Sequence, residues 1–418
     1  MNIIRSFLDK NNQSPFVRNT MIVMGGSVIA NILAYIYHLI IGRILGPVQY
    51  GELGALLSIF YILNVPSGVI QTGLVKYFSV LKARNDKPAA KALFVRSLKT
   101  LVIGGSVCFI ILLPFFPFFA DFLQITNIWN LIILYGVFFS YLFIVPALSY
   151  LTGFQLFSKS VVVTNISSVL RIVFGAVAAF FGVIWALFAN VVSNFATAIL
   201  MFVTLKDLLR EKHTILNISA KRVVSFGMPM VIALLAGTSL YSTDVVLVKH
   251  FFDAHSAGIY TSLSVLGKII FFASFAITSV LFPTIAEKKA KGSGYRRELW
   301  FAVGSVAGIS TVVTAGYFLF PTLVVHLLFG SAYDEGIAYI GWFGMFLSFV
   351  SLSTLFIQSY LAAGRTVVSY IAACAALSQI VLIWMFHASI MQVIMINIVV
   401  TAALTFVLAL GTVQSEHI

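Results

Sequence analysis

The chain has 418 residues, of which 60% are hydrophobic and only 9% are charged. A soluble domain carries about a quarter charged residues, so this composition excludes a water-soluble protein and indicates one that lies in a bilayer. The net charge of +13 comes from 26 Lys and Arg residues against 13 Asp and Glu residues. In a membrane protein such an excess reports loop orientation rather than nucleic-acid binding, and no nucleic-acid partner is expected.

Apolar runs of about 20 residues, the length that crosses a bilayer as a helix, follow one another along the chain. They are predicted near residues 17–42, 53–79, 98–118, 128–151, 161–181, 183–205, 222–250, 258–283, 299–320, 336–361, 366–387 and 391–412. Barrel strands are only about ten residues long and alternate strictly. The sequence therefore predicts an all-α integral membrane protein with about twelve transmembrane helices.

The cations are distributed unevenly over the predicted loops. With the N-terminus in the cytoplasm, 22 of the 26 Lys and Arg residues fall on the inner side. Only Arg43 and Lys249 fall on the outer side, and Arg171 and Lys268 lie within helices. Because loop cations concentrate on the cytoplasmic side of membrane proteins, we expect a multi-pass protein of the cell (inner, cytoplasmic) membrane with both termini in the cytoplasm.

The chain also repeats itself at an offset of about 207 residues. Pro114 and Phe122 recur as Pro321 and Phe329, Gly51 recurs as Gly258, and Asn190 recurs as Asn397. The polar segment 206–221 separates the copies, so two six-helix lobes are predicted, 1–208 and 209–418. Parallel repeats around a central cavity are typical of alternating-access carriers.

Arg171 is predicted about 15 Å from either membrane surface, halfway along its helix. A charge at this depth faces the bundle interior or a wet cavity, so Arg171 is a candidate for substrate binding. The alternative is a structural cation held by backbone carbonyls or by polar neighbours, namely Asn165, Ser167 or Ser168.

Lys268 and Asp244 are the other charged residues predicted within helices. A lone ammonium such as that of Lys268 suits an anionic head group such as phosphate, and the alternative is a salt bridge with Asp244. Asp244 is a candidate coupling site for H⁺ or Na⁺, because the charged state of a buried carboxylate depends on its neighbours. The alternative is a fixed partner for Lys249 or Lys268.

Further polar positions are weaker candidates. Arg18 and Lys76 lie at inner helix ends and either collect a phosphorylated substrate or anchor helices against anionic lipid. Asn31, Asn64 and Gln71 either bond sugar hydroxyls in a cavity or form hydrogen bonds between helices. 

The sequence lacks the patterns of a metal site or of an enzyme. No histidine pair has the spacing of a zinc-binding helix, and no nucleotide-binding loop is present. No metal or cofactor is therefore expected. Cys108 and Cys374 are expected to be small buried hydrophobes.

Three loops together carry a family resemblance. Residues 45–51, with the sequence LGPVQYG, resemble the first outer loop of polysaccharide flippases, which belong to the multidrug/oligosaccharidyl-lipid/polysaccharide exporter superfamily. Residues 257–260, AGIY, with Leu263 following, resemble the matching loop of the C-terminal half. Residues 328–330, LFG, followed by Tyr333 and Ala338, resemble the loop before the tenth helix. The resemblance covers essentially the whole chain.

This resemblance implies transport of a polyprenyl-pyrophosphate-linked oligosaccharide from the inner to the outer leaflet by a monomer. It also implies a central cavity in which cations, here Arg171 and Lys268, attract the pyrophosphate. Three rivals stay open at this point. They are a cation-coupled drug or metabolite exporter of the same superfamily, a membrane polysaccharide polymerase or ligase, and a purely structural membrane protein.

Overall fold

The computed structural model describes residues 15–212 and 228–414, and these residues form helices and no strands. The first lobe contains α2 (Pro15–Ala83), α3 (Lys87–Leu112), η1 (Leu113–Phe115), α4 (Phe116–Phe122), α5 (Trp129–Leu142), α6 (Ile144–Gly153), α7 (Phe157–Ala179), α8 (Val183–Thr204) and α9 (Lys206–Arg210). The second contains α11 (Met228–Leu240), α12 (Thr243–Phe251), α13 (Ala254–Ala290), α14 (Arg296–Leu319), α15 (Pro321–Leu328), η2 (Ser331–Ala338), α16 (Ile340–Ala362), α17 (Val367–Met385) and α18 (Ile390–Gln414). The predicted all-α fold is confirmed.

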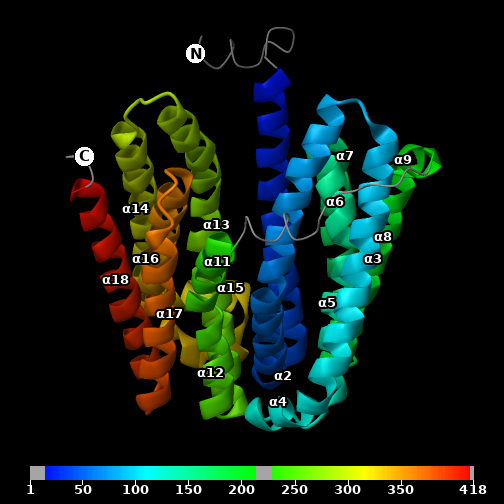
Figure 1. The fold of residues 1–418 in the computed structure, drawn as a ribbon. Helices are drawn as coiled ribbons and strands as arrows, with labels where there is room; N and C mark the ends of the chain where they lie inside the picture. The colour runs from blue at the N-terminus through cyan, green and yellow to red at the C-terminus, as the bar shows by residue number, and fades with distance from the viewer. Residues whose placement is uncertain (1–14, 213–227, 415–418) are drawn as a thin grey trace.

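Among the described residues, ten helices are long and apolar enough to cross a membrane, and the bent pair α11–α12 adds an eleventh. One of the ten, Met21–Ala83, has 63 residues, which at about 1.5 Å per residue is three times the thickness of a bilayer core. It is broken at Gly46, whose φ of 68° is accessible to glycine without strain. The chain doubles back there (Figure 1), so α2 is two crossings and the predicted number of about twelve is reached.

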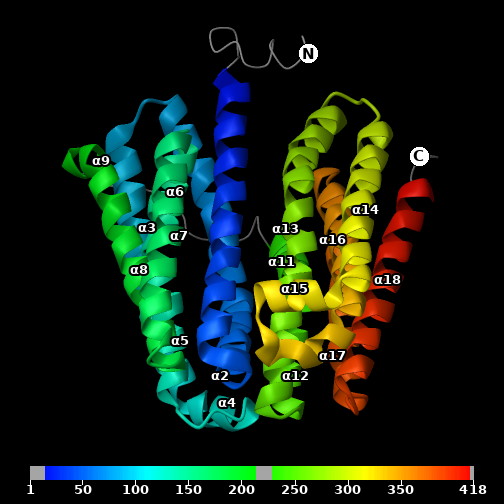
Figure 2. The same cartoon turned by 180° about the vertical axis from the view of Figure 1, so that it is seen from behind.

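The helices form two bundles side by side, with α2 between them (Figures 1 and 2). One apolar core, which includes Tyr37, Leu53, Tyr260 and Phe343, is shared by both bundles at the end where α2 doubles back. Toward the other end each bundle has cores of its own. The lobes are therefore joined at one end, which we call the closed end. The predicted boundary near residue 208 stays a prediction, because residues 213–227 lie outside the described part of the chain.

Glycines at repeat-equivalent positions let the lobes meet at the closed end. A Cβ added to Gly51 would lie 2.6 Å from the backbone nitrogen of Gly258, and one added to Gly258 would lie 1.9 Å from the oxygen of Pro47. Real Cβ atoms do not approach so closely, so this backbone contact requires glycine on both sides.

Polar side chains also bridge the lobes at the closed end. The Tyr333 hydroxyl donates a hydrogen bond of 2.7 Å to the oxygen of Gly42. The Arg43 guanidinium donates to the backbone oxygens of His326, Leu327 and Leu328, which are the last three residues of α15. A cation is favourable at that end of a helix.

Two predicted runs are bent rather than straight, and a third is followed directly by a helix in a new direction. Pro114 and Pro117 end the third crossing in the short 3₁₀ segment η1, after which α4 lies across the closed end (Figure 1). In the second copy Pro321 begins α15, which also lies across the bundle (Figure 2). The run predicted at 222–250 is bent by 45° between α11 and α12. Proline explains the first two changes of direction, because it cannot donate to the preceding turn of a helix.

The prediction that both cysteines are buried is wrong, since Cys108 and Cys374 are exposed. They lie on α3 and α17 among many other exposed apolar side chains. In a membrane protein such surfaces face lipid, which is as apolar as a protein core.

Candidate functional site

A cavity of about 420 Å³, the central cavity, lies between the lobes. Helices α2 and α7 of the first lobe and α11 and α13 of the second contribute to its wall. The lining residues are Ala34, Tyr35, His38, Tyr61, Asn64, Val65, Arg171, Thr238, Tyr241, Val265, Lys268, Phe271 and Phe272. A second hollow of about 340 Å³ shares Thr238, Tyr241 and Phe271 with it and extends along α13 to Phe282. This direction leads away from the closed end.

Arg171 lines the central cavity from α7. Its guanidinium carbon lies 4.6 Å from the centroid of the Tyr37 ring, a distance at which a cation is attracted to the ring face. Within the described part of the chain, no hydrogen bond or ion pair joins Arg171 to Asn165, Ser167 or Ser168, and Asn165 bonds the backbone oxygen of Gly26 instead. The geometry thus favours the cavity-lining interpretation over the structural alternative.

Lys268 reaches the same cavity from α13, in the opposite lobe. Its ammonium lies 5.6 Å from the ring centroids of both Tyr61 and Tyr241. Among the described residues it forms no direct salt bridge with Asp244, although the two charges interact electrostatically across the bundle. The structure therefore brings the two intramembrane cations to one cavity, one from each lobe.

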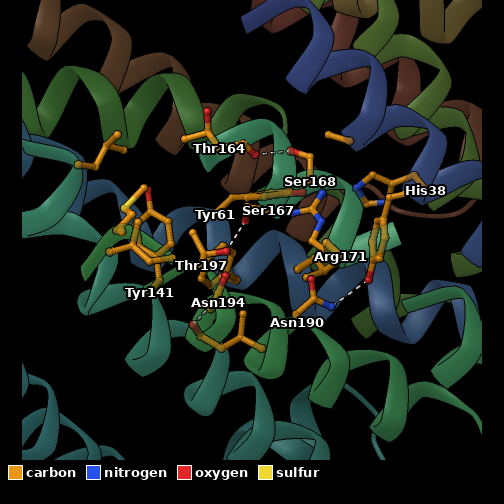
Figure 3. A pocket seen from close by; sticks show the side chains of 18 residues that line it. His38, Tyr61, Tyr141, Thr164, Ser167, Ser168, Arg171, Asn190, Asn194 and Thr197 are labelled. Carbon is orange, nitrogen blue, oxygen red and sulfur yellow. Dashed lines mark hydrogen bonds between the residues drawn. The ribbon is translucent and has the colours of Figure 1, made fainter. Parts of the chain in front are cut away.

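A smaller hollow of about 220 Å³, the N-lobe chamber, opens beside the central cavity within the first lobe (Figure 3). The two spaces share Ala34, His38, Tyr61 and Arg171. Hydroxyl and amide side chains from α7 and α8 supply most of the chamber's polar wall: Thr164, Ser167, Ser168, Asn190, Asn194 and Thr197. Arg171 thus lies where the central cavity, which contains both cations, meets the N-lobe chamber, whose other polar residues are mostly uncharged.

Asp244 is fully buried at the break between α11 and α12, in the first turn of α12. Tyr260 donates a hydrogen bond of 2.7 Å to its Oδ2, and Asn397 lies 3.5 Å from the same atom. The other carboxylate oxygen, Oδ1, is buried and receives no hydrogen bond from the described residues. Lys249 makes no ion pair with Asp244 there either. The site has one open ligand position and a helix N-terminus, which favours negative charge.

The remaining predicted residues are scattered. Asn64 lines the central cavity, and its Oδ1 is buried and accepts no bond from the described residues. Asn31, Gln71 and the exposed Lys76 are not among the residues that line the two cavities. The side chain of Arg18 lies outside the described part of the chain. The roles of these five residues stay predictions.

The polar wall of the N-lobe chamber was missed, although the sequence carries a signal for it. Thr164, Ser168 and Arg171 are spaced by four and three residues, and Asn190, Asn194 and Thr197 repeat the same spacing. Residues three and four apart share one face of a helix. Polar stripes of this kind inside apolar helices indicate surfaces that face each other rather than lipid.

Residues 16–289 match the model of a family described as polysaccharide biosynthesis protein. No curated protein sequence matches the chain.

Solved structures of two kinds share the fold. The lipid II flippase MurJ, in an inward closed conformation, matches with a TM-score of 0.72 at 13% identity over 92% of this chain and 87% of that one. The outward-facing structure of a multidrug resistance MATE family transporter of the MOP superfamily matches with a TM-score of 0.68 at 15% identity over 95% of each chain. A MOP superfamily transporter from Pyrococcus furiosus, for which a reverse polarity of the binding pocket is described, matches with a TM-score of 0.65 at 17% identity over 94% and 95%.

Proposed function

The chain belongs to the polysaccharide biosynthesis protein family, and from this premise we propose that it is a membrane transporter that moves a polyprenyl-pyrophosphate-linked oligosaccharide from the inner to the outer leaflet. The family match confirms the resemblance seen in the loops. The polyprenyl tail stays in lipid while the head group crosses between the lobes. The protein supplies a path and no covalent chemistry.

The observation that carries the proposal is the placement of Arg171 and Lys268 in one cavity between the lobes. A pyrophosphate loses its water shell when it enters an apolar bundle, at a cost of many kcal/mol unless charges replace that shell. An arginine binds phosphate oxygens in pairs and a lysine meets them as a point charge. Since neither cation forms a salt bridge with a described acid, both are available to an anionic ligand.

The proposed movement is alternating access. With the N-terminus in the cytoplasm, the closed end faces outward and the central cavity is reached from the inner leaflet. Opening to the outside requires the contacts of Gly51 with Gly258 and of Arg43 with α15 to separate. Two lobes with two packings are the bistable element that alternating access needs.

Asp244 is the proposed coupling site for H⁺ or Na⁺. Coupling ions in secondary transporters bind near the membrane midplane where helices are interrupted, and Asp244 lies at such an interruption. Its unoccupied Oδ1 is a position for a proton or for one ligand bond to Na⁺.

A cation-coupled drug exporter of the same superfamily is the second candidate, since several similar folds belong to multidrug transporters. Such a cavity needs acids that face cationic drugs. The residues described in the walls of the central cavity and the N-lobe chamber include Arg171 and Lys268 but no Asp or Glu. The charge of the site therefore favours an anionic substrate.

The test is a leaflet-accessibility assay with purified protein in vesicles that contain a fluorescent polyprenyl-pyrophosphate-linked sugar. Arg171→Ala and Lys268→Ala are each expected to reduce the flipping rate by about 10-fold or more, because a charge-assisted hydrogen bond contributes about 1.5–3 kcal/mol. Lys159→Ala is the matched control, since Lys159 is an exposed cation on the same helix as Arg171. Wild-type vesicles that flip no lipid-linked sugar, or cavity variants that flip it normally, would overturn the proposal.

A further inference from the structure

We propose that the N-lobe chamber binds the first sugar of the lipid-linked substrate and selects a neutral, hydroxyl-rich ring, while the pyrophosphate stays at Arg171 and Lys268. This inference rests on the proposed function and names the substrate class of that same site. It follows from the position of the chamber, its size and the direction of its hydrogen bonds.

The chamber lies where the first sugar must be if the pyrophosphate meets the cations. A sugar linked to a pyrophosphate is bonded directly to its terminal phosphate, so the ring lies one bond from the anion. The chamber adjoins the cationic space through the shared residues His38, Tyr61 and Arg171. Its volume of about 220 Å³ is below the roughly 300–1,000 Å³ of pockets for drug-sized ligands. It is suited to one small ring rather than to an oligosaccharide.

The two asparagines of the chamber present oxygens, not N–H groups. The Asn190 amide nitrogen donates to the Tyr37 hydroxyl at 2.9 Å and to the backbone oxygen of Ala186 at 2.8 Å (Figure 3). The Asn194 amide nitrogen donates to the backbone oxygen of Val137 at 3.1 Å and to Ser140. A backbone carbonyl only accepts, so it fixes the orientation of each amide. Both hydrogens of each NH₂ group are thereby used, and no donor from the described part of the chain reaches either Oδ1.

The hydroxyl groups of the chamber are oriented in the same way. Thr164 donates to the backbone oxygen of Ser160 at 3.0 Å, Ser168 donates to that of Thr164 at 3.1 Å, and Thr197 donates to that of Ser193 at 2.7 Å. Each hydroxyl has a single hydrogen and two lone pairs. Thr164 and Ser168 use that hydrogen on their own helix, and Thr197 shares its hydrogen between Ser193 and the Ser167 hydroxyl, which lies 2.5 Å away on α7. The two amides and these three hydroxyls therefore offer a ligand mainly lone pairs, and the hydroxyls of Ser167, Tyr61 and Tyr141 complete the polar wall.

A wall whose amides and threonines present acceptors discriminates between classes of ligand. Sugar hydroxyls carry hydrogens that such a wall can accept, whereas a phosphate or a uronic-acid carboxylate offers only further acceptors, and an unmatched buried polar group is costly. Among the described residues of the chamber wall, Arg171 alone carries a fixed positive charge, and it stands at the entrance shared with the central cavity. The anion is therefore held at the entrance and the neutral ring inside.

The experiment measures binding of three soluble probes to the purified wild-type protein by calorimetry. The probes are farnesyl pyrophosphate, its glucose conjugate and its glucuronic-acid conjugate, each sugar being linked through the pyrophosphate. We expect the glucose conjugate to bind about 10-fold more tightly than either of the others, the size of one or two net hydrogen bonds.

The variant Thr197→Val keeps the shape of the side chain and removes its hydroxyl, which is an acceptor for the ligand and the bonding partner of Ser167. It is expected to weaken binding of the glucose conjugate by about 5-fold and to leave farnesyl pyrophosphate unaffected. Thr164→Val provides an independent second test of the wall. Thr204→Val is the matched control, because Thr204 lies on the same helix as Thr197 and makes the same bond to its own helix outside the chamber.

The outcomes separate the two proposals. If the wild type binds farnesyl pyrophosphate but prefers the glucuronic-acid conjugate or shows no preference, or if Thr197→Val and Thr164→Val both leave glucose-conjugate binding unchanged, the sugar site is wrong and the pyrophosphate site stands. If the wild type binds none of the probes, the proposed function fails and the sugar site fails with it.

Discussion

The two lobes place an equivalent asparagine in different chemical surroundings. At the offset of 207 residues Asn190 corresponds to Asn397, and Tyr37 corresponds to Asp244. In the first lobe the Asn190 amide bonds the Tyr37 hydroxyl at 2.9 Å beside an open chamber. In the second lobe the Asn397 amide bonds the Tyr260 hydroxyl at 2.8 Å, and that hydroxyl bonds the buried carboxylate of Asp244. One scaffold thus supports a space for a ligand in one copy and a closed acidic site in the other.

The same asymmetry holds where the lobes face each other. Lys268 and Tyr61 are repeat-equivalent positions, and the Lys268 ammonium lies 5.6 Å from the centroid of the Tyr61 ring. Two lysines at these positions would repel each other, whereas a lysine and a tyrosine attract. The duplicated helices therefore form the walls of the cavity, and sequence differences between the two copies determine its charge.

The largest difference between the lobes is expected from the acidic site. Asp244→Asn should remove the dependence of flipping on an H⁺ or Na⁺ gradient and slow flipping on the order of 10- to 100-fold, the usual size of coupling between two sites. The measurement is flipping in vesicles with and without an imposed gradient. Asp121→Asn, which changes an exposed acid, is the control. Normal transport by Asp244→Asn with its gradient dependence intact would assign Asp244 a purely structural role.

The second-largest difference between the lobes is expected from Gly51 and Gly258, the two glycines in contact at the closed end. Gly258→Ala should disfavour the closed end by about 1–3 kcal/mol, the cost of inserting a methyl group into a packed contact. Gly51→Ala should have a smaller effect, because its added Cβ would meet its nearest neighbour at 2.6 Å rather than 1.9 Å. Gly308→Ala, where nothing lies within 4 Å of the added atom, should have none.

Spin-label distances report this equilibrium. Labels on the exposed positions Val48 and Ser331, introduced as Val48→Cys and Ser331→Cys after replacement of the native cysteines, lie on opposite lobes at the closed end. A longer distance in Gly258→Ala than in Gly308→Ala is the expected result. Equal distances in the two variants would show that the glycine contact does not control closure.

Removing the hydroxyl that bonds the equivalent asparagine in each lobe should also have unequal effects on stability. Tyr260→Phe should lower the free energy of unfolding by about 2 kcal/mol, because its hydroxyl bonds a carboxylate, and Tyr37→Phe by about 1 kcal/mol, because its hydroxyl accepts a bond from a neutral amide. The midpoints of thermal unfolding in one detergent provide the measurement. A larger loss for Tyr37→Phe would contradict the different chemistry assigned to the two lobes.

The smallest effect on stability is expected at Asp253, in the turn before α13. Gly46, with φ 68°, corresponds to Asp253, which caps α13 by accepting hydrogen bonds from the backbone nitrogens of His255 and Ser256. Asp253→Ala should lower stability by about 1 kcal/mol, the usual cost of losing such a cap.

The pH dependence of this cap has a defined sign. Hydrogen bonds from Ser256 hold the pKa of Asp253 below its ordinary value of 3.8. Its contribution is therefore complete above that value and is lost as the pH falls through the lower folded-state pKa. The difference between wild type and Asp253→Ala should shrink when thermal unfolding is measured at acidic pH. A difference that does not change with pH would assign the effect to packing rather than to the carboxylate.

Much of the fold could be predicted because it depends on local properties of the chain. Apolar runs of about 20 residues predict crossings wherever they occur, and the repeat of Pro114 as Pro321 marks equivalent bends at the closed end. The bend between α11 and α12 could not be predicted, because no proline lies at the break and Gly237 lies a full turn before it. The chamber wall could not be predicted from single residues, because an isolated serine or threonine carries little signal and only a spacing of three and four residues places such side chains on one helix face.

The sequence by itself determined that the chain lies in a bilayer, that it is duplicated, and that Arg171 and Lys268 interrupt long apolar runs. These conclusions follow from hydrophobicity and spacing, which belong to each segment alone. Only the tertiary structure decided that the two cations share one cavity, that Tyr260 and Asn397 enclose Asp244, and that α7 and α8 turn their polar faces toward each other. The rotation of a helix about its axis is set by packing against every neighbour at once, and no single segment carries that information.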